Sequence, residues 1–353
     1  MLRTVMSGAL LAFIVACGGS DGVSPSAETP TTAAPAPGDS VSGPADSVPA
    51  PVDSTSTLPD TLGGLPTDSS GTLEPPTLAS GMQPGIAFGT YQMEPSDLGT
   101  VHTGTLRGGG ITPENVLNLL SAIRAKGGRL VLKMCMGEDR YVKNPDGTFS
   151  LTKWKALVDR FRTVNLGPYI SDGTLLGHFL IDEPQRTAKW GGKIITQATL
   201  EAMAQYSKQI WPTMTTFART VPSWLASSPV TYRALDAGWL QYAAGKGDAA
   251  GLVAAEVAAA KNKGLGIVVG LNILDGGNGS SRVAGWTRGR HAMSATEIRN
   301  YGTALLNQTH VCAFYNWTYN YTGPSYFARS DIKSALTDMS NKARAHVRTS
   351  CKQ

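Results

Sequence analysis

The sequence predicts an α/β protein, a (β/α)8 TIM barrel preceded by a disordered N-terminal segment. From residue 84 on, strand-length apolar runs alternate with amphipathic helical patterns seven clear times, and an eighth strand is weakly indicated at 101–106. Such alternation over roughly 250 residues is typical of a closed parallel barrel covered by helices. An open doubly wound sheet is the alternative, but Gly108-Gly109-Gly110 lacks the usual Gly-x-Gly-x-x-Gly spacing and a strong preceding strand.

The first residues form an export signal pattern. Arg3 precedes an apolar run at 8–16 that is too short to span a bilayer, and small residues flank Cys17. This stretch resembles a bacterial lipoprotein signal. The resemblance implies that residues 1–16 are a signal peptide and that Cys17 carries lipid, palmitate included. Because Gly18 is not aspartate, we expect the lipid to anchor the protein in the cell envelope, at the outer membrane or cell surface.

Residues 17–83 form the second segment. They are rich in Pro, Ser, Thr, Ala, Gly and Asp, and no Lys or Arg occurs between Gly18 and Met82. A chain of this composition cannot bury enough apolar surface to offset its ordering entropy. We therefore expect a disordered acidic tether that holds the domain at 84–353 away from the membrane.

Charge and cysteine content exclude several classes of function. The net charge is +5, but the basic residues are scattered and no dense Lys/Arg block suggests a nucleic-acid partner. If Cys17 is lipidated, Cys135, Cys312 and Cys351 can form at most one disulfide, and the sequence does not choose the pair. The histidines are isolated, so we expect no metal and no cofactor. His178, inside a predicted strand, is expected to be a hydrogen-bonded core residue.

The first predicted elements follow from local signals. Strands are expected at 85–91, 101–106, 129–134 and 175–183, because each stretch is apolar or β-prone and ends at turn residues. Thr112 is predicted to cap a helix with Pro113 at its first position, and Ser150 to cap a second helix.

The later helices and strands are also predicted from local signals. Helices are expected at 198–210, 249–263, 294–306 and 330–345, the third opened by a capping box of Ser294 and Glu297. Strands are expected at 214–221, 235–244, 266–274 and 311–317, of which 266–274 is the plainest buried strand.

Active sites of such barrels lie at the C-terminal ends of the strands. Acids, aromatics and one amide are expected there: Glu94, Asp97, Glu138, Asp139, Asp182, Glu183, Tyr242, Asp275, Asn316 and Trp317. Carbohydrate rings stack on aromatics, and cleaving a glycosidic bond requires a proton donor and a second carboxylate. The pattern therefore indicates a site for a polysaccharide or oligosaccharide.

Two motifs carry a family resemblance. The strand that ends in Asp182-Glu183-Pro184 is similar to the fourth strand of clan A glycoside hydrolases, which usually ends in Asn-Glu-Pro, and the run 313–317 resembles their eighth strand. The resemblance implies that Glu183 is the general acid/base, that Asp182 replaces the asparagine that binds substrate, and that Trp317 stacks on the sugar. Tyr242, Asn316 and Glu138 are further candidates for substrate binding, although Tyr242 is more readily explained by packing.

The second catalytic carboxylate departs from the family pattern. Where the family ends its seventh strand in a nucleophilic glutamate, this chain has Asp275 followed by Gly276 and Gly277. Asp275 is a nucleophile, a base for an inverting reaction, or the start of a turn, and the sequence leaves these open. The leading hypothesis is a surface-anchored glycoside hydrolase, and the alternative is a barrel lipoprotein that binds glycans without cleaving them.

Overall fold

The computed structural model of the protein describes residues 81–319, 324–347 and 350–352. The predicted signal peptide, Cys17 and nearly all of the predicted tether lie outside these residues. The described chain forms a closed barrel of parallel strands that pair in chain order, β1 with β2 and so on to β8, which pairs with β1. This confirms the predicted (β/α)8 barrel and excludes the open sheet.

The strands and helices alternate as expected, and the weak pattern near residue 104 is a genuine strand. The strands are β1 Ala87–Tyr91, β2 Gly104–Arg107, β3 Arg129–Leu132, β4 Leu175–Asp182, β5 Thr216–Arg219, β6 Ala237–Tyr242, β7 Gly266–Leu271 and β8 Val311–Asn316. The helices are α1 Val116–Ala125, α2 Leu151–Asp159, α3 Gly167–Ser171, α4 Gln197–Ile210, α5 Pro222–Ala226, α6 Ala249–Asn262, α7 Ala295–Leu306, α8 Pro324–Ala328 and α9 Ser330–Ala345.

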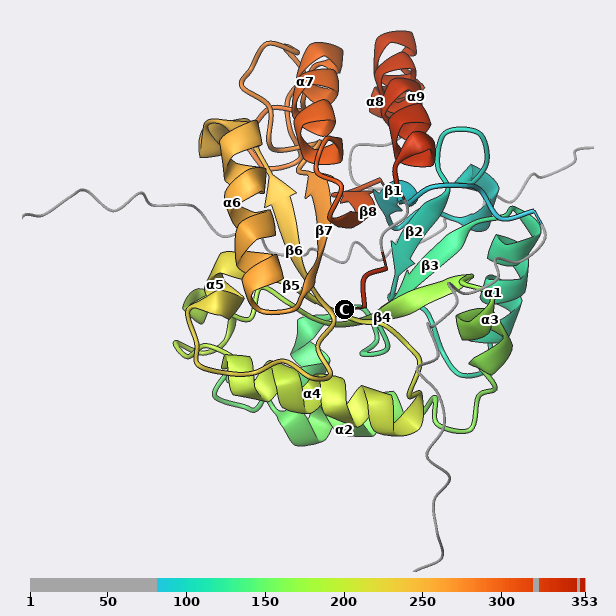
Figure 1. The fold of residues 1–353 in the computed structure, drawn as a ribbon, viewed down its shortest axis with the longest axis vertical. Coiled ribbons are helices and arrows are strands. Elements are labelled where there is room, and N and C mark those ends of the chain that lie inside the picture. The colour runs from blue at the N-terminus through green and yellow to red at the C-terminus, as the bar shows by residue number, and fades with distance from the viewer. Residues whose placement is uncertain (1–80, 320–323, 348–349, 353) are drawn as a thin grey trace, which may run out of the picture. The chain divides into compact units, whose positions relative to one another are not determined.

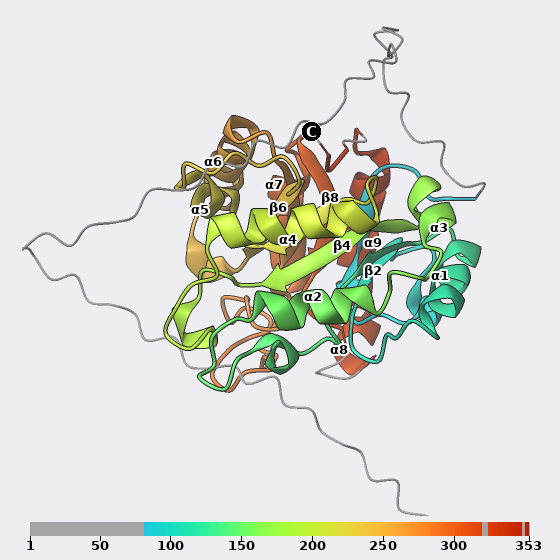
Figure 2. The same ribbon diagram turned by 90° about the horizontal axis from the view of Figure 1, so that it is seen from below.

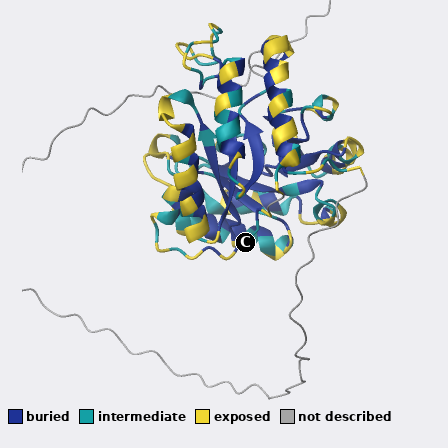
Figure 3. Cartoon of the chain, turned by 45° about the horizontal axis from the view of Figure 1, so that its top comes forward, coloured by how far each residue is buried: buried dark blue, intermediate teal, exposed yellow. Residues whose placement is uncertain are grey.

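The helices surround the barrel on its outside (Figure 1), and a view from below shows α2 and α4 side by side against β4 (Figure 2). Their buried faces pack on the strands, whereas their outer faces are exposed (Figure 3). The apolar positions at helical spacing therefore form a layer of core between helices and barrel.

Two of the three predicted helix caps are confirmed. The Ser150 side chain accepts a hydrogen bond from Lys153 N at the start of α2, and Ser294 with Glu297 forms the predicted capping box of α7. The predicted cap at Thr112 is wrong, because α1 starts only at Val116 with Asn115 at its N-cap. The Asn115 side chain accepts from Thr112 N, so these residues form a turn instead, a competition that Asn side chains commonly win near helix starts.

The interior of the barrel is filled by large aromatic side chains. Tyr91, Phe179, Trp239 and Tyr315 come from β1, β4, β6 and β8, and the Phe179 and Trp239 rings lie 5.7 Å apart and edge to face. Tyr91 and Tyr315 each pack on Trp239, with ring centroids 5.5 and 5.6 Å away. The barrel is thus a packed core, and a ligand site has to lie above this aromatic layer.

A disulfide joins Cys312 on β8 to Cys351 near the C-terminus, and Cys135 is free and buried. The Cys351 backbone lies so close to Gly266, at the start of β7, that an added Cβ there would approach it to 2.9 Å. The C-terminal segment therefore covers the end of the barrel where the strands begin. The opposite end, where the strands finish, carries the candidate site.

Candidate active site

A bulge at the end of β4 presents Asp182. Phe179 pairs with Phe217 of β5, but Ile181 pairs with Ala218 and Asp182 with Arg219, so Leu180 is an extra residue. Leu180 and Ile181 both join the outer core, which lets Phe179 and Asp182 face the interior although they are three residues apart. The Leu180 carbonyl accepts a hydrogen bond of 3.0 Å from Trp154 Nε1 on α2, which satisfies it at the bulge.

The next residue, Glu183, has an unusual backbone. Its φ is 47°, in the left-handed region that residues other than glycine rarely adopt and that costs on the order of 1–3 kcal/mol. Three hydrogen bonds hold it there: its N–H donates to the Arg219 carbonyl at 3.0 Å, and its carbonyl accepts from Arg186 N at 3.1 Å and Trp190 Nε1 at 2.9 Å. Strain retained by such over-determined surroundings is typical of functional sites.

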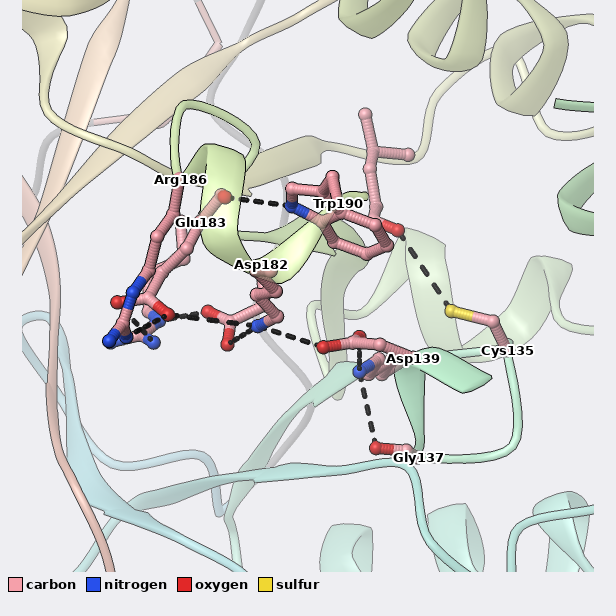
Figure 4. A network of polar contacts seen from close by, with 11 residues as sticks. Cys135, Gly137, Asp139, Asp182, Glu183, Arg186 and Trp190 are labelled. Carbon is pink, nitrogen blue, oxygen red and sulfur yellow. Dashed lines mark hydrogen bonds and ion pairs between the residues drawn. The ribbon is translucent and has the colours of Figure 1, made fainter. Parts of the chain in front are cut away.

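The side chains of three acids and four cations form one network at this end of the barrel (Figure 4). Lys189 is its centre: Lys189 Nζ lies 2.6 Å from Asp182 Oδ2, 2.8 Å from Asp139 Oδ2 and 3.7 Å from Glu183 Oε2. Lys133 pairs with Asp139 at 3.1 Å. Three carboxylates from the ends of β3 and β4 are therefore held together by one ammonium group.

Glu183 lies at the outer edge of this network. Its Oε2 lies 3.3 Å from Arg186 Nη1, and its Oε1 lies 3.5 Å from Arg219 Nη2. Its side chain is 25% exposed, so the carboxylate is accessible from the barrel mouth. We define the mouth cluster as these seven residues: Lys133, Asp139, Asp182, Glu183, Arg186, Lys189 and Arg219.

Asp182 is the most strongly perturbed acid of the mouth cluster. Burial alone would raise its pKa, but the charges of Arg219, Lys189 and Lys133, with a hydrogen bond from Arg219 Nε, together hold that pKa well below the usual range. In turn, burial would lower the pKa of Lys189, and the charges of Asp182 and Asp139 raise it instead. Asp182 is therefore ionised at neutral pH and acts as a fixed negative charge.

Tyr91 lies directly beneath the mouth cluster. Burial raises the pKa of its phenol well above the usual value, and the charges of Arg219, Asp182 and Glu183 act on it. Its hydroxyl has no hydrogen-bond partner in the part of the chain that the structure describes. Unpaired buried polar atoms are rare and are usually satisfied by water or ligand.

Asp275 lies in the loop between β7 and α7. Its carboxylate accepts hydrogen bonds from Thr287 N at 2.9 Å and from Thr287 Oγ1 at 2.7 Å. The neighbouring Trp286 packs edge to face on Trp317, with ring centroids 5.5 Å apart. Asp275 thus fixes the loop segment that places Trp286 on Trp317, and its role as nucleophile or base stays a prediction.

The predicted binding residues have different surroundings. Trp317 is partly buried, next to Trp286 and above the aromatic interior. Asn316 is fully buried; its Oδ1 accepts from Leu271 N at 3.2 Å and its Nδ2 donates to the Gly89 carbonyl at 3.3 Å. These bonds join β8 to both neighbouring strands.

Neither Tyr242 nor Glu138 forms a hydrogen bond or ion pair with a residue of the mouth cluster. Tyr242 is fully buried against Tyr301 of α7, and its hydroxyl donates to the Gly247 carbonyl. Glu138 pairs with Arg140 at 2.8 Å near the surface. Packing accounts for Tyr242 as described, and substrate contacts of Tyr242, Asn316 and Glu138 stay predictions.

Sequence reasoning missed the loop cations and the second aromatic. Arg186 and Lys189 follow Glu183 by three and six residues. At this spacing a tight turn brings both side chains back to the end of the strand, so the spacing could have indicated that they pair with its acids. Trp286 carried no local signal, because its contact with Trp317 joins two separate loops.

His178 is confirmed as a core residue: it is fully buried, and its Nδ1 lies 2.9 Å from Ser207 Oγ. Among the described residues, no group of three or more His, Cys, Asp or Glu side chains is arranged to hold a metal ion. No helix within those residues combines the length and apolar character needed to cross a membrane.

The fold and site together define a (β/α)8-barrel protein with a charged site at the C-terminal ends of its strands. No family model and no curated protein matches the sequence. Among solved structures, it is similar to the β-glucanase SdGluc5_26A from Saccharophagus degradans in complex with cellotetraose, with TM-score 0.53 and 10% identity over 74% of this chain and 88% of that one.

Two further similar structures are more distant. A putative α-L-fucosidase from Bacteroides thetaiotaomicron gives a TM-score of 0.46 and 9% identity over 80% of this chain and 100% of that one. An exo-β-1,4-mannosidase from an Opitutaceae bacterium gives a TM-score of 0.48 and 14% identity over 76% of this chain and 62% of that one. All three neighbours are glycoside hydrolases, and at 10% identity the likeness to the β-glucanase shows the shared barrel fold alone.

Proposed function

We propose that the protein is a glycoside hydrolase that cleaves a polysaccharide or oligosaccharide, with Glu183 as general acid/base. One observation carries this proposal: Glu183 is locked in a strained backbone conformation with its carboxyl group accessible at the mouth of a closed parallel barrel. The similarity of the fold to a β-glucanase solved with cellotetraose supports the same class of substrate.

The chemistry requires two carboxyl groups. One protonates the leaving oxygen, and the other attacks the sugar or activates a water. In the proposed mechanism Glu183 is the proton donor, and Asp275 or Asp182 supplies the second carboxylate. Because Glu183 now pairs with Arg186 and Arg219, substrate binding has to replace part of these ion pairs before the proton is transferred.

The aromatic pair Trp286 and Trp317 supports a sugar-binding surface. Their rings meet edge to face where β7 and β8 end, and both side chains are only partly buried. Indole rings of this kind stack on the apolar faces of sugars. We assign to this pair the role of holding the sugar ring that lies beside the scissile bond.

The test is Glu183→Gln assayed by released reducing ends on a panel of neutral and acidic polysaccharides. Loss of a general acid/base lowers kcat/KM by about 100-fold or more. Glu114→Gln is the matched control, because Glu114 is an exposed acid in the turn before α1. Equal turnover by the wild type and Glu183→Gln would remove Glu183 from the mechanism.

A barrel that binds glycans without cleaving them is the second candidate. Both Asp275 oxygens accept hydrogen bonds from Thr287, and both Glu183 oxygens face cations, an arrangement that also suits a binding site. Saturable glycan binding by calorimetry, with no new reducing ends after prolonged incubation, distinguishes this candidate from the enzyme.

We also propose that lipid on Cys17 anchors the protein at the outer membrane or cell surface, after removal of residues 1–16. The small residues around Cys17 and the acidic, Lys- and Arg-free stretch behind it support this. Metabolic labelling with an alkyne palmitate analogue tests it: the full chain should incorporate the label and fractionate with membranes, whereas Cys17→Ala should do neither. Labelling of Cys17→Ala to the same extent would contradict the proposal.

A further inference from the structure

The mouth cluster carries more positive than negative charge. Four cations, Lys133, Arg186, Lys189 and Arg219, face three carboxylates. Sites for neutral sugars need hydrogen-bonding groups and aromatic faces, but they do not need an excess of cations. Lys133, Lys189 and Arg219 are largely buried against these acids, and Arg186 is 42% exposed, so the mouth presents a surplus of positive charge to solvent that attracts an anionic ligand.

Lys246 adds a fifth cation near the mouth cluster, from the loop after β6. It ends the short 3-10 helix Ala244–Lys246 that follows β6, and it is exposed. Three contacts fix its loop: the Ala244 N–H donates to the Gly276 carbonyl at 2.8 Å, the Lys246 N–H donates to the Ala243 carbonyl at 2.9 Å, and the Tyr242 hydroxyl donates to the Gly247 carbonyl. These contacts fix the backbone from which the flexible Lys246 side chain extends.

The Lys246 ammonium lies within electrostatic range of Arg219 and Glu183. Within the described residues it makes no hydrogen bond or ion pair. Glu256 of α6 also attracts it, but that carboxylate bonds to the N–H of Ser223 at 2.8 Å and to its hydroxyl at 2.7 Å, and it forms no direct ion pair with Lys246. Arg219 is paired with Asp182 and Glu183, whereas Lys246 has no ion-pair partner in the described chain and is available to bind an anion near Glu183.

Tyr91 is the second and independent observation. Only 8% of the residue is exposed, its ring is fixed against Phe179 and Trp239, and its hydroxyl is the unpaired donor described above. Its ring lies 6.4 Å from that of Phe179, the interior residue of β4 that comes before Asp182, and the charges of Arg219 and Glu183 act on its phenol. A ligand oxygen that opens the 3.5 Å contact between Arg219 and Glu183 would find this donor beneath it.

We propose that the ligand contains an acidic sugar, and that its anionic group, the carboxylate of a uronic acid or a sulfate ester, binds between Lys246, Arg219 and the Tyr91 hydroxyl beside Glu183. This deepens the proposed function by assigning its substrate class. An anion there competes with Glu183 for Arg219, so binding also releases the carboxyl group that the hydrolase mechanism requires. Arginine suits this role because its planar fork matches a carboxylate.

The experiment measures binding separately from cleavage. The purified full chain is titrated calorimetrically with a hexamer of galacturonic acid, a neutral cellohexaose of equal length and a sulfated hexasaccharide. Lys246→Gln removes the charge at the rim, Tyr91→Phe removes only the hydroxyl, and Lys261→Gln on the exposed side of α6 is the matched control. Each variant's far-ultraviolet circular dichroism and thermal unfolding verify that it folds.

We expect an acidic hexamer to bind at least about tenfold more tightly than cellohexaose, because hydrogen bonds to charged groups are stronger than those between neutral groups. Lys246→Gln should weaken acidic binding about tenfold and leave neutral binding unchanged, and Tyr91→Phe should weaken it measurably. The galacturonate and sulfated arms decide which anion is preferred.

Two results overturn the inference. In the first, the neutral hexamer binds as tightly as both acidic ones. In the second, Lys246→Gln and Lys261→Gln weaken acidic binding equally, which shows unspecific attraction to a basic protein. If either result is obtained and a neutral glycan is cleaved, the hydrolase proposal stands and only the acidic ligand is rejected. If the acidic hexamer binds tightly and no glycan is cleaved, the hydrolase proposal is rejected and the acidic ligand stands.

Discussion

Asp182 on β4 and Arg219 on β5 are register partners whose side chains form an ion pair at the mouth of the barrel. The bulge at Leu180 is what turns Asp182 toward Arg219, since without the extra residue Asp182 would face the helices. The pair therefore depends on strand register, and it sets the electrostatic environment of Glu183.

Arg219→Met should destabilise the protein by about 3 kcal/mol, because it leaves the partly buried Asp182 without its main partner. Urea unfolding at pH 7 measures the change. The control is Arg299→Met, which breaks the exposed pair with Asp338 and should cost less than about 1 kcal/mol. Equal losses for the two variants would mean that the mouth pair is no stronger than a surface pair.

Acid should destabilise the fold from about pH 6.5 downward. Burial lowers the pKa of His178 to about 3 and that of His102 to about 4. In the unfolded protein the histidines have pKa values near 6.5 and bind protons, whereas in the folded protein they stay neutral. The free energy of unfolding therefore decreases as the pH is lowered through this window, by about 1.4 kcal/mol per pH unit for each histidine. Asp182, whose folded pKa is lowered, adds a further loss only below about pH 4.

His178→Gln should remove one histidine's share of that slope between pH 6.5 and 4.5. Unfolding free energies from urea titrations at several pH values measure it. Val158→Ala, in the same outer core, should lower stability by about 2 kcal/mol at every pH and keep the wild-type slope. An unchanged slope in His178→Gln would show that this imidazole does not stay neutral in the folded protein.

The disulfide between Cys312 and Cys351 should stabilise the fold by up to about 4 kcal/mol, because it closes a loop with a sequence separation of 39 residues. Thermal unfolding with and without reductant measures this difference. The double variant Cys312→Ala/Cys351→Ala should lose the response to reductant, whereas Cys135→Ala should retain it. A full response in the double variant would assign the effect to another group.

Trp286→Ala should weaken glycan binding about fivefold, because it removes one aromatic face worth about 1 kcal/mol. Calorimetric titration with the best-bound oligosaccharide measures it. Tyr169→Ala is the control, since Tyr169 lies on α3, which precedes β4 and so stands at the other end of the barrel. If both substitutions have the same effect, the aromatic pair is not the sugar platform.

Local patterns were sufficient to predict the fold, and they indicate the end of the barrel that carries the candidate site. Apolar runs such as Gly266–Leu271 encode burial on both faces of a strand, and capping residues such as Ser294 act within one turn, so neither depends on distant parts of the chain. The end of β4 could be recognised for the same reason, because its apolar run stops at Asp182.

Only the tertiary structure decided the chemistry of the site. Whether Asp182 meets Arg219, whether Lys189 joins three carboxylates, whether Asp275 is engaged by Thr287 and which cysteine pairs with Cys312 all depend on register, one bulge and loop paths. A linear sequence carries the types of these groups and their spacing, but the distances between charges arise when separate strands are brought side by side. The sequence by itself thus determined the barrel and the ends of its strands, and the closed barrel determined which charges meet there.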